Sequence, residues 1–387
     1  MSGVQLPSAA ALMAEARQRA GIDIVDEAAR EPLERLVHAL NTEGQLHEAG
    51  GSGMTARLVR ILANRLRMQR DIAAHPEILG EPVTAPLFIC GMARTGSTKT
   101  QKLLAASGDF NWLPYWKVLN PSLWTGDRAE PVQPRIDDVE AFARWFDAAS
   151  PETAAGHAFE THEPEEESFI LEHSLRTPTF LGWAPIPSYL DWLFTQDMTA
   201  QFIQLRDTLK YLQWQGLGDS TRSWVLKSPL YSGLEPLLLA VFPDAKLVMT
   251  HRHPDKTIAS GLRLLELFYA PFTDAAVDVD GYVGGLAAMI NGHLDARPTL
   301  PPDTFLDIHF DELVFDIPAT VRRIYDFIGA RLSPEALARM IAWDHANPQH
   351  KRGTHRYTMA QYGLDDAGIA RSFARYDAFL AQCFPGR

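Results

Sequence analysis

The chain has 387 residues, of which 46% are hydrophobic and 22% are charged, a composition typical of a globular protein large enough for one big α/β domain with an added subdomain. Its formal net charge of −12 argues against a nucleic-acid polymer as a partner. Two cysteines, Cys90 and Cys383, are too few for a disulfide framework or a zinc site.

The cysteine usage and the apolar runs favour a protein of the reducing cytoplasm. The N-terminal segment carries Glu15, Arg17 and Arg19 among alanines and lacks the apolar core of a signal peptide. No uninterrupted apolar run in the sequence approaches the ~18 residues of a membrane span. We therefore expect a cytoplasmic protein without a membrane span.

Residues 1–80 are predicted to be helical, because two groups of apolar residues repeat at the spacing of a helix face. These groups are Leu33, Leu36, Val37 and Leu40, and then Leu58, Ile61, Leu62 and Leu66. Glu81 and Pro82 mark the junction to the first strand. We expect an α-helical N-terminal extension over 1–80, packed over the site or in a homodimer contact, and an α/β domain over 81–387.

Residues 91–98 have the spacing of a phosphate loop, G-x-x-x-x-G-K-[ST], with Ser97 in the place of the lysine. An apolar run over 86–90 precedes them, and a helix over 99–107 is predicted to follow. A glycine-containing loop between a strand and a helix N-terminus directs backbone N–H groups and the positive helix end at an anion. We therefore expect a phosphate or sulfate group here. The alternative is a strand-to-helix turn that binds nothing.

Two features argue against a nucleoside triphosphate as the ligand of this loop. The loop has no lysine to reach the β- and γ-phosphates. The predicted strand over 246–250 runs into His251 and Arg252 and so offers no carboxylate for magnesium. A nucleotide without a γ-phosphate fits these residues better.

The segment 110–215 is rich in aromatic residues and is interrupted by prolines. Its tryptophans are Trp112, Trp116, Trp124, Trp145, Trp183, Trp192 and Trp214. Most of the rings are expected in the core because aromatic side chains bury so much area. The others can line an apolar pocket.

Four strands separated by helix-length stretches are predicted in the core, over 87–90, 224–227, 247–250 and 304–309. The stretches 232–241 and 312–328 are examples of the intervening helices. Strands that alternate with helices indicate a parallel sheet with right-handed crossovers. The predicted fold class is therefore α/β, a P-loop NTPase-like parallel sheet flanked by helices. Ligands of such sheets bind at the carboxyl ends of the strands, where Arg94, Lys227 and Arg252 fall.

With these motifs the chain resembles the sulfotransferases that use 3′-phosphoadenosine 5′-phosphosulfate, particularly the bacterial branch related to protein-tyrosine sulfotransferases. The loop of that family reads approximately G-x-P-R-[ST]-G-T-T. The matching residues are Gly91, Arg94, Thr95, Gly96 and Thr98. Ala93 and Ser97 depart from the pattern.

Two further segments carry the resemblance, which extends over most of residues 85–385. Residues 224–229, with the sequence WVLKSP, are similar to the strand-ending W-x-L-K-[ST]-P of the family. Further along, Arg252, Pro254 and Ser260 resemble the element R-[DN]-P with a later serine, which implies a 3′-phosphate site. His253 replaces the usual Asp or Asn.

The resemblance implies 3′-phosphoadenosine 5′-phosphosulfate as the donor, adenosine 3′,5′-bisphosphate as the product and no metal. The aromatic residues of 110–215 favour, as the acceptor, the hydroxyl of a largely apolar small molecule, such as a phenol, a sterol or a lipid-like alcohol, held by an acceptor-pocket insert over 110–215. Sulfuryl transfer needs in-line positioning and fixed cations, for which Arg94 and Lys227 are the candidates. The candidate cofactor residues are Arg94, Thr95, Gly96, Ser97, Thr98, Lys99, Arg252, Ser260, Lys351, Arg352 and Gly353, among which Ser97 and Lys99 are departures from the family pattern.

The base for the acceptor hydroxyl is where the chain departs from its relatives. Many of them carry a glutamate shortly after the first helix, where this chain has Trp116 and Lys117. What remains is residues 161–167, with the sequence THEPEEE, which we call the acidic segment. Pro164 fits the first position of a helix, and acidic residues in a first turn complement the helix dipole. A purely structural role for these carboxylates is therefore the alternative to catalysis.

Glu166 is the preferred base within the acidic segment. Its spacing to Phe169 and Ile170 places it on the apolar face of the expected helix. Partial burial on that face would suit a general base. His162 and Glu165 are the next candidates.

Three residues suggest alternatives to transfer. Lys99, Gln101 and His253 depart from the family pattern, and if these changes disable transfer, the protein is a catalytically altered nucleotide-binding relative. A P-loop kinase, with Lys99 as a displaced loop lysine, is the remaining alternative.

Overall fold

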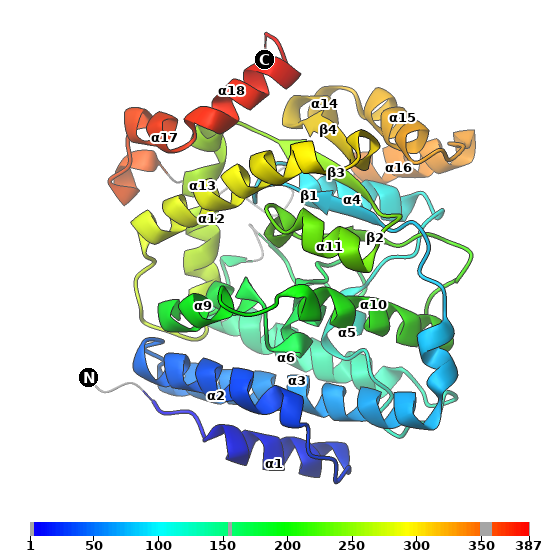
Figure 1. Ribbon diagram of the computed structural model, residues 1–387, viewed down its shortest axis with the longest axis vertical. Coiled ribbons are helices and arrows are strands. Elements are labelled where there is room, and N and C mark those ends of the chain that lie inside the picture. The colour runs from blue at the N-terminus through cyan, green and yellow to red at the C-terminus, as the bar shows by residue number, and fades with distance from the viewer. Residues whose placement is uncertain (1–3, 154–156, 349–357, 387) are drawn as a thin grey trace. The chain divides into compact units, whose positions relative to one another are not determined.

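The computed structural model describes residues 4–153, 157–348 and 358–386 (Figure 1). The chain divides into two compact units, each built from three stretches. The helical unit comprises Met1–Val83, Leu113–Ser220 and Leu265–Val277. The sheet unit comprises Thr84–Trp112, Thr221–Leu264 and Asp278–Arg387. The division at residue 80 and the acceptor-pocket insert over 110–215 stay predictions.

A four-stranded parallel sheet in the described residues organises the sheet unit, with the strand order β2-β1-β3-β4. Its strands are β1 (Leu87–Cys90), β2 (Val225–Lys227), β3 (Lys246–His251) and β4 (Phe305–His309). All four coincide with predicted strands, and the predicted α/β fold class is confirmed. Strands covered on both faces by helices read as continuous apolar runs, as β1 does here. The order places the ends of β2, β1 and β3 next to one another.

Helices cover this sheet and close its core. They include α4 (Ser97–Ala106), α11 (Glu235–Val241), α12 (Pro254–Tyr269), α13 (Val279–Ala296), α14 (Phe310–Phe315), α15 (Ile317–Phe327), α16 (Pro334–Ala346), α17 (Asp366–Ser372) and α18 (Ala374–Cys383). Leu103 and Leu104 of α4 pack with Ile89 and Val248 of the strands and with Ile324 of α15. This packing fixes the position of the α4 N-terminus against the ends of the strands.

The single helix predicted over 312–328 is two helices in the structure. Asp316 separates α14 from α15, and its side chain accepts a hydrogen bond from the backbone N–H of Ala319. Pro318 occupies the first turn of α15, where its missing N–H costs nothing. The helix predicted over 232–241 begins later, at Glu235, because the chain takes a positive φ of 86° at Gly233.

The helical unit begins with α1 (Ala9–Ala20), α2 (Glu27–Thr42) and α3 (Glu48–Ala74). The other helices are α5 (Tyr115–Leu119), α6 (Gln133–Ala149), α8 (Ser168–Leu171), α9 (Pro187–Leu193) and α10 (Thr199–Trp214). No helix among the described residues combines the length and the apolar character needed to cross a membrane.

Helix α3 buries charged and polar side chains as well as its predicted leucine face. Arg57 and Glu172 form an ion pair of 2.6 Å with both side chains almost fully buried. Arg60 pairs with Asp138 at 3.1 Å, and Asn64 donates to the backbone oxygen of Leu119. Because buried charges require partners, these pairs determine how α3 packs.

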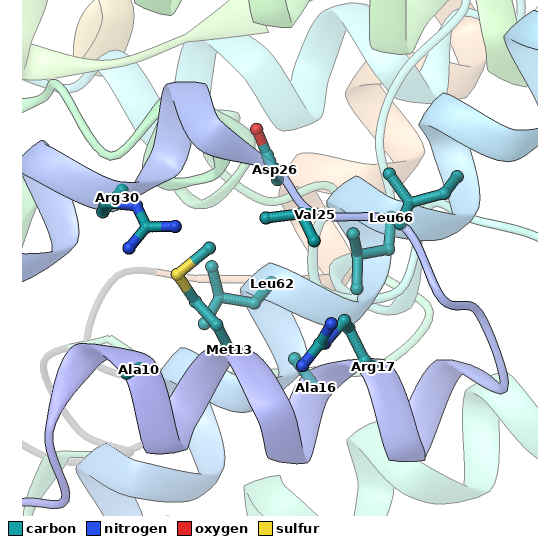
Figure 2. Close-up of a pocket in the computed structure, with 10 residues that line it drawn as sticks. Ala10, Met13, Ala16, Arg17, Val25, Asp26, Arg30, Leu62 and Leu66 are labelled. Atoms are coloured by element: carbon teal, nitrogen blue, oxygen red, sulfur yellow. The ribbon is translucent and has the colours of Figure 1, made fainter.

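A hollow of about 200 Å³ lies among α1, α2 and α3 (Figure 2). Apolar residues form part of its lining, namely Ala10, Met13, Ala16, Leu62 and Leu66. The charged side chains that line it have partners, because Arg17 pairs with Asp23, Arg30 with Glu27 and Asp26 with Arg65. The hollow therefore offers a ligand apolar contacts but no uncompensated charge.

His173 makes the stability of the fold depend on pH. Its Nδ1 donates to the backbone oxygen of Ile170 at 3.2 Å, and its Nε2 accepts from Asn64 at 3.3 Å. Burial lowers its pKa from 6.5 to about 3, so the folded protein holds this ring neutral. The unfolded chain protonates first as the pH falls. The contribution of the neutral His173 ring to the free energy of unfolding is therefore fully present above pH 6.5. It decreases toward pH 3 by up to ~1.4 kcal/mol per pH unit.

We expect His173→Gln to reduce the slope of the unfolding free energy against pH between 6.5 and 4.5. The reduction should reach at most ~1.4 kcal/mol per pH unit, which corresponds to the uptake of one proton on unfolding. Urea unfolding at several pH values measures this slope. His38→Gln, at an exposed position of α2, is the matched control. An unchanged slope in a folded His173→Gln variant would contradict the assignment.

Candidate active site

Residues 91–96 connect β1 to α4 and form what we call the anion loop. Gly91 and Gly96 have φ angles of 117° and 96°, a region that favours glycine. A Cβ at Gly91 would lie 2.3 Å from the backbone oxygen of Thr250, so no side chain fits there. Gly96 caps α4, whose first N–H groups lack partners within the helix and point toward the loop. The loop therefore has the backbone geometry of an anion site.

Two threonines attach the anion loop to the end of β3. The hydroxyl of Thr95 lies 2.7 Å from the backbone oxygen of Met92 and 2.7 Å from the hydroxyl of Thr250, and its single proton serves one of these two contacts. Thr250 in turn donates to the backbone oxygen of Cys90 at 2.9 Å. All three contacts are buried, which makes the loop conformation part of the sheet core.

Three of the predicted cofactor residues form one cluster. The guanidinium Nε of Arg94 donates to the hydroxyl of Ser260 at 3.0 Å. Arg252 donates to the backbone oxygen of Arg94 at 3.3 Å. Its guanidinium carbon lies 3.9 Å from the centroid of the Phe310 ring. The residues predicted for the two ends of the cofactor therefore touch one another.

Lys227 is the last residue of β2 and lies in register with Ile89 of β1. Its side chain is buried, and the next residue, Ser228, donates its N–H to the backbone oxygen of Ile89 at 3.2 Å. Because β2 neighbours β1, Lys227 lies at the same edge of the sheet as the anion loop. This edge gathers Arg94, Thr95, Gly96, Ser97, Thr98, Lys227, Arg252 and Ser260.

Lys99 lies in the first turn of α4, and its ammonium forms an ion pair of 2.7 Å with Asp344 of α16. Its cofactor role stays a prediction, because a carboxylate already compensates its charge. The basic strap predicted at Lys351, Arg352 and Gly353 lies outside the described residues.

Sequence reasoning missed three residues of this edge. Thr250 and Phe310 lie at the carboxyl ends of β3 and β4. Their positions at the ends of predicted strands could have identified them as site residues. Tyr282 of α13 has no such signal. Its hydroxyl packs so closely on α12 that a Cβ at Gly261 would lie 2.0 Å from it. Burial raises the pKa of the Tyr282 phenol, and the charge of Arg94 opposes that shift.

The acidic segment in the helical unit is extended where a helix was predicted. The N–H of Glu165 donates to the backbone oxygen of Leu113, and the N–H of Tyr115 donates to that of Glu163. Helix α8 begins only at Ser168, so Pro164 is not its first residue and Glu166 precedes it. The expected helix face was wrong because these bonds to residues 113–116 replace the first helical turn.

The carboxylates of the acidic segment differ in exposure. Glu165 and Glu167 are buried, Glu166 is half-buried and His162 is exposed. The carboxylate of Glu166 accepts from the hydroxyl of Ser168 at 3.0 Å. Glu165 accepts from the N–H of Glu166 at 2.8 Å, and both of its oxygens lie 3.1 Å from Nε2 of His157. Glu166 therefore combines partial exposure with a fixed side chain.

Lys117, which follows Trp116 in α5, is half-buried and bonded to the main chain. Its ammonium donates to the backbone oxygen of Leu217 at 2.6 Å. Burial lowers its pKa from 10.5 to about 8, with a further contribution from the nearby charge of Arg135. Lys117 therefore has a partner within the helical unit.

Comparisons with known proteins agree on one family. Residues 86–334 match the family described as "Sulfotransferase family". The chain is 24% identical over 306 residues to the omega-hydroxy-beta-dihydromenaquinone-9 sulfotransferase Stf3 of Mycobacterium bovis (strain ATCC BAA-935 / AF2122/97) and of Mycobacterium tuberculosis (strain CDC 1551 / Oshkosh). These alignments cover 75% of this chain and 74% of each relative.

Two crystal structures are similar over nearly the whole chain. Sulfotransferase STF9 from Mycobacterium avium superimposes with a TM-score of 0.83 and 26% identity, covering 98% of this chain and 97% of that one. Sulfotransferase STF1 from Mycobacterium tuberculosis H37Rv superimposes with a TM-score of 0.78 and 26% identity, covering 96% of this chain and 99% of that one.

We expect Thr250→Val to lower the free energy of unfolding by about 1–3 kcal/mol, because the change removes two buried contacts, those with the Cys90 carbonyl and with the Thr95 hydroxyl. Urea denaturation measures the difference. Thr42→Val, which removes a hydroxyl bond to the backbone of α2 outside the site, is the control. Equal stability of Thr250→Val and the parent protein would show that these hydroxyls do not hold the loop.

Proposed function

The chain belongs to the sulfotransferase family, and we propose that it transfers the sulfuryl group of 3′-phosphoadenosine 5′-phosphosulfate to the hydroxyl of a largely apolar small molecule. One observation carries the choice of donor. The edge of the sheet unit combines an anion loop without a lysine, the strand-end cation Lys227, and a contiguous cluster of Arg94, Arg252 and Ser260.

The geometry of the edge fits two anionic groups of one nucleotide. Gly91 lets the anion loop pack directly on the backbone of Thr250, and the N-terminus of α4 would supply N–H donors for the 5′-phosphosulfate. Arg252 and Ser260, at the end of β3 and on α12, would hold the 3′-phosphate. The hydrogen bond between Arg94 and Ser260 links the two positions, so occupation of one orients a residue of the other.

The one acidic residue within the four strands that the structure describes is held by other side chains. Asp307 of β4 accepts from His251 at 2.9 Å and from Arg297 at 2.8 Å. These partners hold the pKa of its carboxyl near 2, against the effect of burial. This supports a donor that needs no magnesium, because a carboxylate held in two such bonds is not arranged as a metal ligand.

Lys227 and Arg94 are the residues we assign to the transfer step. When bound, the cofactor would supply a sulfuryl group for transfer to the acceptor oxygen, with the bridging phosphate oxygen as the leaving atom. Negative charge then develops on the bridging oxygen, and a buried ammonium stabilises it more strongly than an exposed one does. The proton of the acceptor hydroxyl passes to the base, which we assign to Glu166. Glu165 and the exposed His162 are the next candidates.

We base the choice of an apolar acceptor on the aromatic-rich composition of 110–215, although the largest cluster of rings in the helical unit is mostly buried. Rings of Phe146, Phe159, Phe268 and Phe272 contact one another and Trp183 with centroid separations of 5.0–6.4 Å. A relative with 24% identity is named for a menaquinone-derived acceptor with an omega-hydroxyl group. We propose that the acceptor is a lipid-like alcohol, a sterol or a phenol. We further propose that the protein is cytoplasmic and forms homodimers.

We expect adenosine 3′,5′-bisphosphate to bind tightly in the presence of EDTA, since the loop uses N–H donors and cations in place of a metal. Isothermal titration calorimetry tests this directly, with ATP and magnesium as the comparison. Transfer from labelled 3′-phosphoadenosine 5′-phosphosulfate to a panel of phenols, sterols and fatty alcohols tests the full reaction. Preferential binding of magnesium ATP would favour a kinase and contradict the proposal.

We expect Arg252→Ala and Ser260→Ala mainly to raise the KM for the cofactor, because a 3′-phosphate is bound equally in the ground and transition states. Lys227→Met, which retains the buried stem, should mainly lower kcat by about 10²- to 10³-fold, as loss of one fixed donor to developing charge does.

Steady-state kinetics on the three variants separates the two effects. Arg322→Ala, at an exposed position of α15 in the same unit, is the control. Equal losses of kcat with unchanged affinity in all three variants would overturn the division of roles.

A further inference from the structure

His157 and Glu165 form a buried pair beside the proposed base. The ring of His157 lies between the rings of Phe159 and Phe268, with centroid separations of 4.9 and 5.6 Å. The backbone N–H of His157 donates to the backbone oxygen of Thr153 at 2.7 Å, which fixes the main chain at this residue. These contacts hold the ring, and its Nε2 lies 3.1 Å from each oxygen of Glu165.

Glu165 transmits this contact to the next residue. One of its oxygens, Oε1, also accepts from the N–H of Glu166 at 2.8 Å. Its own N–H is bonded to the backbone oxygen of Leu113, which holds the main chain on the other side. A carboxylate only accepts hydrogen bonds, so the ring nitrogen of His157 must carry the proton. The pair therefore acts on the backbone of Glu166 through a charge-assisted bond.

Burial separates the roles of the two glutamates. The Glu165 side chain is 6% exposed, and its oxygens face His157 and the N–H of Glu166. Glu166 is half-buried, and Ser168 fixes one of its oxygens. A residue that takes a proton from a substrate must reach that substrate, whereas a residue that orients another need not. Glu166 fits the first description, and Glu165 fits the second.

We propose that His157 and Glu165 are positioning residues, which hold Glu166 in the orientation in which it removes the proton of the acceptor. The inference rests on the proposed function, in which Glu166 is the base. It assigns His157 a role in the reaction that no sequence motif suggested. The chain of contacts runs from the His157 ring to the Glu165 carboxylate and then to the N–H of Glu166.

A metal ion is the competing interpretation of the same residues. One ligand atom from each of His157, Glu165 and Glu166 lies within 4.8 Å of the others. The geometry favours the positioning role, because His157 and Glu165 already bond to one another directly and Glu165 also accepts from a backbone N–H. The experiment includes arms with EDTA and with added zinc to distinguish the two.

The test is a double-mutant cycle on kcat. We expect His157→Leu to lower kcat by up to about 10²-fold, the scale of a misplaced catalytic group, with unchanged affinity for adenosine 3′,5′-bisphosphate. His157→Gln, whose amide N–H can replace Nε2, should retain most of the activity. Glu166→Gln should cost about 10²- to 10⁴-fold, the worth of a general base. In the Glu166→Gln background, His157→Leu should cost nothing further.

Controls and a second measurement keep the outcomes apart. His38→Leu repeats the substitution at an exposed site, and thermal unfolding verifies that each variant folds. Glu165→Gln should lose less activity than Glu166→Gln, because an amide oxygen still accepts from the N–H of Glu166. The amide proton resonance of Glu166, read by NMR with selective labelling, should move in His157→Leu even in a protein that transfers nothing.

Four results would overturn the inference. His157→Leu could lower kcat by the same factor in the parent protein and in the Glu166→Gln variant. Glu165→Gln could cost more than Glu166→Gln, which would make Glu165 the base. Activity could vanish in EDTA and return with zinc. The Glu166 amide resonance could stay in place in His157→Leu. Lack of transfer by the parent protein, with the resonance shifted as expected, would instead reject the proposed function alone.

Discussion

The close approach of the anion loop to the end of β3 is the constraint on which the candidate cofactor site depends. Gly91 comes so near the backbone of Thr250 that a Cβ would lie 2.3 Å from its oxygen. The buried hydroxyls of Thr95 and Thr250 then attach the loop to the strands on both sides. Because the loop is held in this way, Arg94 extends from a φ of 71° toward Ser260. Displacement of the loop would separate the residues proposed for the two phosphates.

Preorganisation explains how a protein with a net charge of −12 can offer a site to a polyanion. The cations of the sheet edge are held by specific contacts, as Arg252 is by the Phe310 ring and by the backbone of Arg94. Fixed donors need no reorganisation when a ligand binds, so a few of them suffice where a mobile basic surface would need many. The global charge therefore says little about this local site.

The acidic segment is held by a different type of interaction. Its start is bonded to the backbone of residues 113–116, and Glu172, five residues beyond its end, is paired with Arg57. Trp183 donates its ring N–H to the same carboxylate and also lies under the Arg57 guanidinium at 4.1 Å. Loss of one partner would leave a buried charge uncompensated, which typically costs about 3–5 kcal/mol. The positions of Glu165 and Glu166 thus depend on a buried ion pair that no local pattern indicated.

Sequence alone determined the strands, the position of the anion loop, and the carboxyl ends of the strands as the place where Arg94, Lys227 and Arg252 lie. Each of these follows from a local rule: apolar runs make buried strands, glycine permits positive φ, and parallel strands share one carboxyl edge. Only the tertiary structure decided the bond between Arg94 and Ser260, the pairing of Lys99 with Asp344, and the extended backbone around Pro164. These depend on partners far away in the chain, and spacing along the sequence carries no information about which distant group will satisfy a charge or an N–H.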